Sequence, residues 1–174
     1  TLTIGKGGGN IASNSAVGFQ ALNDNTSGTN NIAFGYQALN KNITHNNCAF
    51  GYQALMSNTS GQSNCAFGSY ALKDNTTSNF NCAIGRDAGS NNTTGANNTF
   101  LGSFANVNAG ANGYSNSTAL GYNATITDSN QIVLGIAATT VYVPGKVNTA
   151  ADITVNTLTI GKGGGNIASN SAVG

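Results

Sequence analysis

The stretch NIAFGYQAL at residues 31–39 decides the fold, because it recurs at a nearly fixed spacing. It returns as NCAFGYQAL at 47–55, NCAFGSYAL at 64–72 and NCAIGRDAG at 81–89. One glycine marks each copy and can be followed through eight copies, at spacings of 17, 16, 17, 17, 17, 19 and 14 residues. A short period of this kind is typical of proteins that stack one structural unit many times. We call these residues the repeat glycines and number positions in each copy relative to them; they are Gly18, Gly35, Gly51, Gly68, Gly85, Gly102, Gly121 and Gly135.

Each copy predicts a short strand, a bend at the repeat glycine, a second short strand and a polar turn. Glycine allows a bend that a Cβ would hinder, and Asn, Thr, Ser and Gly are turn-forming residues. Turns such as NTSG at 25–28 hold a glycine that we expect to take a positive φ. The fold class is therefore predicted to be all-β, a parallel β-solenoid or β-roll with rungs of about 17 residues. Rungs would stack at ~4.8 Å, the spacing of hydrogen-bonded strands.

The strand before each repeat glycine carries large apolar residues at position −1 and mixed residues at position −3. These two positions share one face of a strand, so we expect that face to line the core. Position −2 is mostly alanine, which we expect to point outward, against a closely packed backbone such as a subunit interface. Asn at position −4 of successive rungs predicts a column of stacked amides. The predicted core ladder is Val17, Phe34, Phe50, Phe67, Ile84, Leu101, Leu120 and Leu134.

A second, longer repeat encloses the first. Residues 1–18 recur without change at 157–174, an offset of 156 residues. The repeat indicates a natural tandem array of such units, an engineered duplication of one unit, or an overlap at a filament joint, and each of these is periodic. The β-branched residues after Gly135 predict a connector of extended strands. The predicted organisation is a connector and Gly-rich break at 1–10, a rung stack at 11–139, a connector at 140–165 and the start of the next unit at 166–174.

Composition excludes several classes of protein. Charged residues make up only 6% of the chain, the formal net charge is +1, and Asn makes up about one residue in six. Such a charge offers no field that would attract nucleic acid. No apolar run approaches the roughly 20 residues that span a bilayer, so we expect no membrane insertion. The 39% of hydrophobic residues, placed in strict register, argue against disorder.

Residues suited to catalysis or cofactor binding are few and scattered. His45 is the only histidine and lies in the turn NITHNN, so we interpret it as a surface turn residue. The acids Asp24, Asp74, Asp87, Asp128 and Asp152 form no calcium loop. The stretch GKGGG at 5–9 lacks the order of a phosphate-binding loop. We therefore expect no catalytic, metal or cofactor site and no enzymatic activity.

Two further columns of residues are chemically modifiable: one of cysteines and one of asparagines in glycosylation sequons. Cys48, Cys65 and Cys82 occupy position −3 of consecutive rungs, which favours free buried thiols, with disulfides between adjacent rungs as the alternative. Asn-x-Ser/Thr sequons at a rung spacing indicate either a row of exposed N-glycosylation sites or simply good turn residues. The candidate glycosylation sites are Asn25, Asn42, Asn58, Asn75, Asn92, Asn116 and Asn123.

The repeat resembles the head repeats of trimeric autotransporter adhesins, and is similar to segments of viral and phage tail fibres. The likeness runs from about Asn14 to Ala138 and is clearest in the four copies quoted above. The stretch SNQIVLGIAATTVYVPGKV at 129–147 is similar to a segment that closes such arrays in viral fibres. The resemblance implies a left-handed parallel β-roll, three chains per fibre and attachment at a surface.

Together these observations favour a structural protein that forms an extracellular filament or fibre shaft at a cell or virion surface. We expect self-association, as a homotrimer and end to end, with polar turns facing outward, either bare or glycosylated. The alternative is an adhesin or viral tail-fibre module that binds a host receptor or glycan. Tyr36, Tyr52 and Tyr70 either supply contacts for such a ligand or pack between neighbouring rungs.

Overall fold

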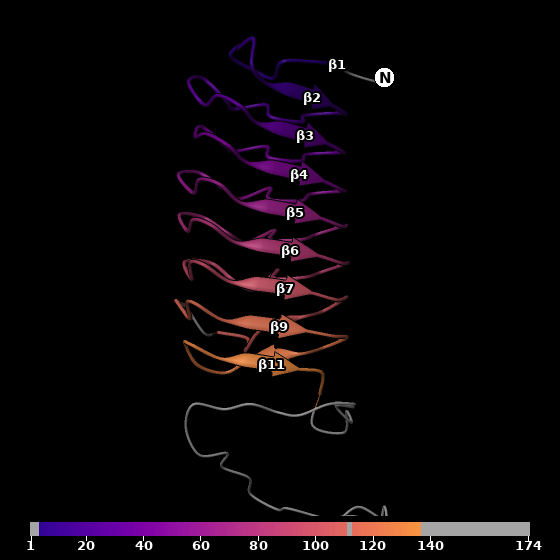
Figure 1. Cartoon of the computed structure of the whole chain (residues 1–174). Coiled ribbons are helices and arrows are strands. Elements are labelled where there is room, and N and C mark those ends of the chain that lie inside the picture. The colour runs from indigo at the N-terminus through magenta and orange to yellow at the C-terminus, as the bar shows by residue number, and fades with distance from the viewer. Residues whose placement is uncertain (1–3, 111–112, 137–174) are drawn as a thin grey trace, which may run out of the picture. The chain divides into compact units, whose positions relative to one another are not determined.

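The computed structural model of the chain describes residues 4–110 and 113–136. Within these residues the backbone winds into a stack of rungs, each lying directly on the one before (Figure 1). No helix occurs in this part of the chain, and the all-β parallel solenoid is confirmed. The predicted connector at 140–165 and the next unit at 166–174 lie outside the described residues.

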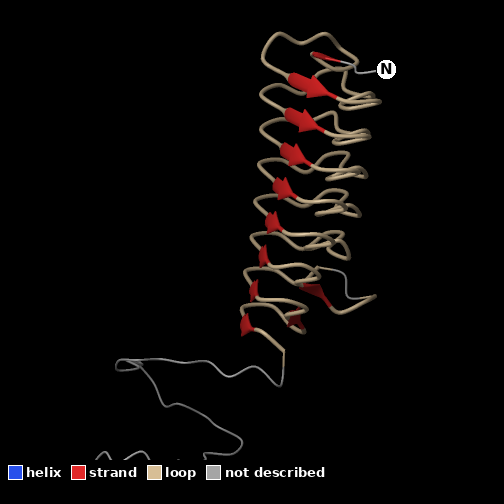
Figure 2. Cartoon of the chain, turned by 90° about the vertical axis from the view of Figure 1, so that its right-hand side faces the viewer, coloured by secondary structure: helices blue, strands red, loops and turns tan. Residues whose placement is uncertain are grey.

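Short strands form a continuous sheet along one side of the stack, as Figure 2 shows. The sheet has nine strands in the order β1-β2-β3-β4-β5-β6-β7-β9-β11, and β8 and β10 form a separate parallel pair. The strands are β1 Ile4–Gly5, β2 Ser15–Val17, β3 Ile32–Phe34, β4 Cys48–Phe50, β5 Cys65–Phe67, β6 Cys82–Ile84, β7 Thr99–Leu101, β8 Asn106–Val107, β9 Thr118–Leu120, β10 Thr125–Ile126 and β11 Ile132–Leu134.

The register of the sheet follows the sequence repeat. From β2 onward neighbouring strands of this sheet are parallel, and residues at the same repeat position pair with each other. Ala33 pairs with Ala49, Ala49 with Ala66, and Ala66 with Ala83. Each side chain of these strands therefore stands next to its equivalent in the neighbouring rung, so each strand position becomes a column along the stack.

The predicted core ladder is wrong, because the strand faces are inverted. The interior is lined by position −2 of β2 to β7 and β9, by Ala at position +3, and by Leu at position +4 of the first four rungs, all nearly inaccessible, whereas Val133 at position −2 of β11 is only partly buried. The large residues at position −1 point outward, and Phe34 remains 51% exposed. A rung of about 17 residues encloses little space, so the inward position accepts a methyl group and alternation sends its neighbours out. The inverted ladder is Val17, Phe34, Phe50, Phe67, Ile84, Leu101, Leu120 and Leu134.

One exchange shows how tightly this interior is filled. Position −2 of the sixth rung holds Phe100, which is fully buried where other rungs have alanine. In the fifth rung, position +4 is Gly89, whereas the first four rungs hold leucine at this position. A Cβ at Gly89 would lie 2.7 Å from Cδ2 of Phe100 and 2.9 Å from Cδ2 of Leu72. The ring therefore occupies the space that a leucine would need, and the packing density of the core is kept.

The second strand predicted after each repeat glycine is absent from the regular rungs. Positions +2 and +4 there have positive φ, for example 54° at Gln37 and 50° at Leu39, which is incompatible with a strand. The chain makes a tight turn instead, yet its backbone still bonds between rungs, as from Gln37 N to Phe19 O at 2.9 Å. Among residues 4–110 and 113–136, only β8 and β10 provide strands on this side.

Two sets of glycines are required for different reasons. The repeat glycines form a column with φ from 115° to 144° between Gly18 and Gly121, a conformation that L side chains rarely adopt. The turn glycines Gly28, Gly61 and Gly95 do not have the positive φ we expected. A Cβ there would overlap a backbone carbonyl of the next rung, as it would that of Thr44 at Gly28. These turns need glycine because the rungs approach closely.

Strand β1 closes the first edge of the sheet. It runs antiparallel to β2, pairing Ile4 with Val17 and Gly5 with Ala16, whereas all other pairs in the described residues are parallel. Such a strand covers backbone groups that would otherwise be open to pairing with another chain.

Candidate functional site

The titratable residues that the sequence singled out lie apart from one another. Nδ1 of His45 is 3.0 Å from the backbone N of Thr29, whose N–H it accepts, so the half-buried ring fixes a turn of the preceding rung. Asp74 and Asp87 contact the neighbouring Lys73 and Arg86 at 3.6 and 3.1 Å. No group of three or more His, Cys, Asp or Glu in the described residues is placed to hold a metal ion. Asp152 lies outside those residues.

The row of exposed sequons is wrong for five of the seven candidate asparagines. Asn25, Asn42, Asn58, Asn75 and Asn92 are 0–1% exposed. In the first turn, Nδ2 of Asn25 donates to the carbonyl of Gly28 at 2.9 Å, and its Oδ1 accepts from Gly28 N at 2.9 Å. An amide nitrogen engaged in this way has no room for a glycan, so a sugar added before folding would prevent the turn from closing. Asn116 and Asn123 are exposed.

These buried asparagines form one of two amide columns in the stack. The second is the predicted column at position −4, where Oδ1 of each residue accepts the backbone N–H of its equivalent in the next rung, as from Asn47 N to Asn31 Oδ1 at 2.9 Å. Their Nδ2 atoms donate to turn carbonyls, as Asn64 does to Ser78 at 2.8 Å. No buried side-chain polar atom of the described residues lacks a partner. The asparagine-rich composition therefore builds the interior of the rod.

The three cysteines are free and half-buried on the outward face of β4, β5 and β6, not in the core. Burial raises the pKa of all three thiols, and the neighbouring thiols raise those of Cys65 and Cys82 further. Because the thiolate is the nucleophile, thiols of raised pKa react slowly at neutral pH.

We expect folded protein to react with iodoacetamide at pH 8 several-fold more slowly at these cysteines than protein unfolded in urea. The raised pKa keeps the thiols protonated, so the folded rate should continue to rise above pH 9, where the unfolded rate levels off. Mass spectrometry of peptides quenched at successive times measures both rates. Equal rates in the folded and unfolded protein would contradict this prediction.

A wide apolar face runs along the sheet. We define it as positions −1 and −3 of β2 to β7, β9 and β11; neither position carries a charged residue. The rings of Phe34, Phe50 and Phe67 stack on each other with centroids 5.5 and 4.8 Å apart. Exposed fractions of 41 to 51% at most of its large residues correspond to an apolar area on the order of 1,000 Å². Patches on monomers are usually a few hundred Å².

An aromatic column borders this face just beyond the repeat glycines. Phe19, Tyr36 and Tyr52 stack with centroids 5.6 and 5.1 Å apart, and Tyr70 meets Tyr52 edge-on at 5.2 Å. The interpretation that these tyrosines pack between neighbouring rungs is confirmed. Phe19, Tyr36 and Tyr52 nevertheless remain 41 to 52% exposed.

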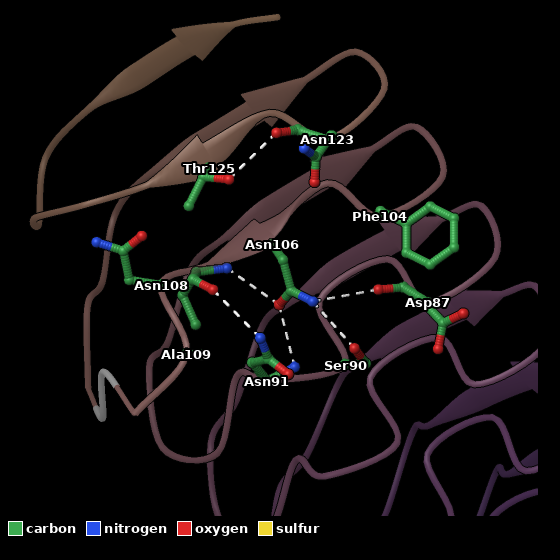
Figure 3. A pocket seen from close by; sticks show the side chains of 10 residues that line it. Asp87, Ser90, Asn91, Phe104, Asn106, Asn108, Ala109, Asn123 and Thr125 are labelled. Atoms are coloured by element: carbon green, nitrogen blue, oxygen red, sulfur yellow. Dashed lines mark hydrogen bonds between the residues drawn. The ribbon is translucent and has the colours of Figure 1, made fainter. Parts of the chain in front are cut away.

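A polar cavity lies in the last rungs of the stack, beside β8 and β10. Its volume is about 460 Å³, and its lining includes Asp87, Asn91, Asn106 and Asn123 together with the ring of Phe104 (Figure 3). Sequence reasoning missed it, although the spacing of 19 residues between Gly102 and Gly121 and the loss of Leu at position +4 marked these rungs as irregular.

Comparison with known proteins assigns no function to these surfaces. The chain matches no protein family model, no curated protein and no solved structure. None of the described residues forms a helix long and apolar enough to cross a membrane. The resemblance to adhesin heads and viral fibres therefore rests on the repeat motif itself.

Proposed function

We propose that the chain is a structural, non-enzymatic element of an extracellular fibre at a cell or virion surface. In this proposal three copies pack side by side through the apolar face, and rung stacks follow one another along tandem 156-residue units. The apolar face is the observation that carries the proposal. An area on the order of 1,000 Å² is close to the roughly 800 Å² that each partner contributes to a standard interface.

A second copy is the partner that suits this face best. Its phenylalanine and leucine columns repeat at the rung spacing, and another stack of the same rungs presents the same spacing. The absence of charge at positions −1 and −3 leaves no repulsion between identical faces. The repeat motif, similar to that of trimeric adhesin heads, supports three copies in preference to two.

Replacing Phe67 with glutamate should dissociate the assembly. A charge at the centre of an apolar interface is left without a partner, and loss of a central aromatic residue typically weakens association by about 30-fold or more. Size-exclusion chromatography with light scattering should give three times the chain mass for the parent protein and the chain mass for Phe67→Glu.

Phe80→Glu is the matched control. Phe80 is 62% exposed but lies outside the apolar face, five residues before the repeat glycine. This variant should keep the mass of the parent. A parent protein that is monomeric at every concentration, or equal masses for both variants, would reject the proposed interface. Electron microscopy of the full-length protein should show continuous rods; isolated short heads would reject the fibre.

A second candidate function is a binding module that recognises a host receptor or glycan. The polar cavity beside β8 and β10 favours it, because the fold of the regular rungs does not require such a cavity. Both functions are compatible with one fibre, since the cavity residues lie outside the apolar face.

A further inference from the structure

The polar cavity begins where the core changes from leucine to polar residues. Position +4 holds Leu in the first four rungs, then Gly89, Asn106 and Thr125. Asn106 replaces the packing of a leucine with four hydrogen bonds. Its Oδ1 accepts from the backbone N of Asn91 and of Val107, both at 3.0 Å. Its Nδ2 donates to Ser90 Oγ at 2.9 Å and to the Asp87 carbonyl at 3.3 Å.

This network gives the cavity a fixed polar floor. Figure 3 shows Asp87, Ser90, Asn91 and Asn106 joined by these bonds, with Asn123 and Thr125 on neighbouring segments of the lining. A floor whose groups are already held by the protein loses little freedom when a ligand binds. A volume of about 460 Å³ falls in the range of small-molecule sites, roughly 300 to 1,000 Å³.

Several polar groups of the lining remain available to a ligand. Within residues 4–110 and 113–136, the side-chain amides of Asn108 and Asn123 have no hydrogen-bond partner. The carboxylate of Asp87 accepts from Arg86 Nε at 3.1 Å through Oδ2, which leaves Oδ1 free of bonds to the described residues. Two amides that both donate and accept, with an acceptor carboxylate at the opposite end of the lining from Asn108 (Figure 3), suit a ligand with several hydroxyl groups.

The charge of the lining selects among such ligands. Asp87 is the single charged residue among the described residues that line the cavity, and the nearby Arg86 is already paired with it, so the lining offers an anionic ligand no unpaired cation. One carboxylate is too few for a calcium site. The ring of Phe104 and the methyl group of Ala109 add apolar surface for C–H groups. A sugar ring presents such a combination, because hydroxyl groups and C–H groups project from different parts of it.

We infer that this cavity is a binding site for a neutral pyranose, one hexose unit of a glycan, with Asp87, Asn108 and Asn123 as the hydrogen-bonding residues. The inference rests on the second candidate function and is independent of the apolar face. Asp87 accepts bonds from sugar hydroxyls, while the amides of Asn108 and Asn123 donate to and accept from neighbouring hydroxyls. A single sugar in an open site should bind with a dissociation constant on the order of 1 mM.

Saturation-transfer NMR with the methyl glycosides of glucose, galactose and mannose tests the inference on the full chain. At least one glycoside should show saturable transfer, and sialic acid should show none. Asp87→Asn, which keeps the shape and removes the charged acceptor, should weaken binding at least fivefold. Asn123→Ala should weaken it about threefold. Asp74→Asn, which changes an aspartate that does not line the cavity, should leave binding unchanged.

Three outcomes would overturn the inference: no transfer from any of the three glycosides, binding unaffected by both cavity variants, or preferential binding of sialic acid. Retained circular dichroism spectra confirm that the variants are folded. None of these outcomes bears on the fibre, because light scattering measures self-association independently. A negative result here combined with a trimeric mass would leave the structural role intact.

Discussion

Gly51→Ala is expected to destabilise the rung stack by at least about 3 kcal/mol. Gly51 has φ 144°, which an alanine adopts only with strain, and its Cβ would overlap the carbonyl of Gly68 in the next rung. Relief of that overlap requires the rungs to move apart, which weakens the hydrogen bonds on both sides of the sheet. In a stack, where each rung contacts only its neighbours, a break in the middle separates the two halves.

Urea unfolding followed by circular dichroism measures the change, at one fixed protein concentration because association adds to apparent stability. Gly5→Ala is the control. No atom lies within 4 Å of a Cβ built at Gly5, and its φ is not positive. Its free energy of unfolding should stay within about 0.5 kcal/mol of the parent. A similar small effect for Gly51→Ala would show that the rungs are not packed as closely as described.

The second large effect is expected from Asn64→Ala. Oδ1 of Asn64 accepts the backbone N–H of Asn81 at 2.9 Å, and its Nδ2 donates to the carbonyl of Ser78 at 2.8 Å. Alanine leaves the N–H of Asn81 without this partner inside the rod, whereas the carbonyl of Ser78 still accepts from Asn75 Nδ2 at 3.3 Å. One unsatisfied buried group costs about 1 to 3 kcal/mol and the second lost hydrogen bond about 1 kcal/mol, so the free energy of unfolding should fall by about 2 to 4 kcal/mol.

The matched control is Asn23→Ala, which removes an exposed amide whose hydrogen bond joins it to the adjacent Asp24. Its effect on stability should be within about 0.5 kcal/mol. Hydrogen exchange at the Asn81 backbone amide gives a local measure. Its exchange rate should increase in Asn64→Ala and stay the same in Asn23→Ala. Equal unfolding free energies for the two variants would contradict a structural role for the amide column.

The period and the register of the fold were predictable from sequence. The repeat glycines stand at nearly equal spacing, and stacking of equal units places each residue above its equivalent, so the columns at positions −4 and −2 follow directly. The position of the bend also follows, because only glycine tolerates the φ of this column.

Which strand face lines the core was not predictable from residue size. Alternation shows that positions −1 and −3 share a face but does not say which face is inside. We assigned the larger residues to the interior, as in a domain with a wide core. The informative signal is uniformity: position −2 is nearly always alanine, while position −3 varies among Ser, Ile, Cys and Thr. A narrow interior accepts one size of side chain, whereas an outer surface tolerates variation.

The prediction that the sequon asparagines form an exposed row was wrong for a related reason. Asn25 is followed three residues later by Gly28, and the same spacing joins Asn58 to Gly61 and Asn92 to Gly95. That pattern matches an asparagine whose amide bonds to the glycine three residues on, which the structure shows. The polar cavity was harder to foresee, since it depends on how two irregular rungs replace the leucine column.

The antiparallel strand β1 has a consequence for how rungs can be added at this end of the stack. Because β1 pairs with the edge of β2, a rung of another molecule cannot stack in parallel directly onto β2. In its place β1 offers an edge of only two residues, too short to guide a full rung into register. The first rung is thereby protected from uncontrolled sheet extension, the route by which exposed strand edges aggregate.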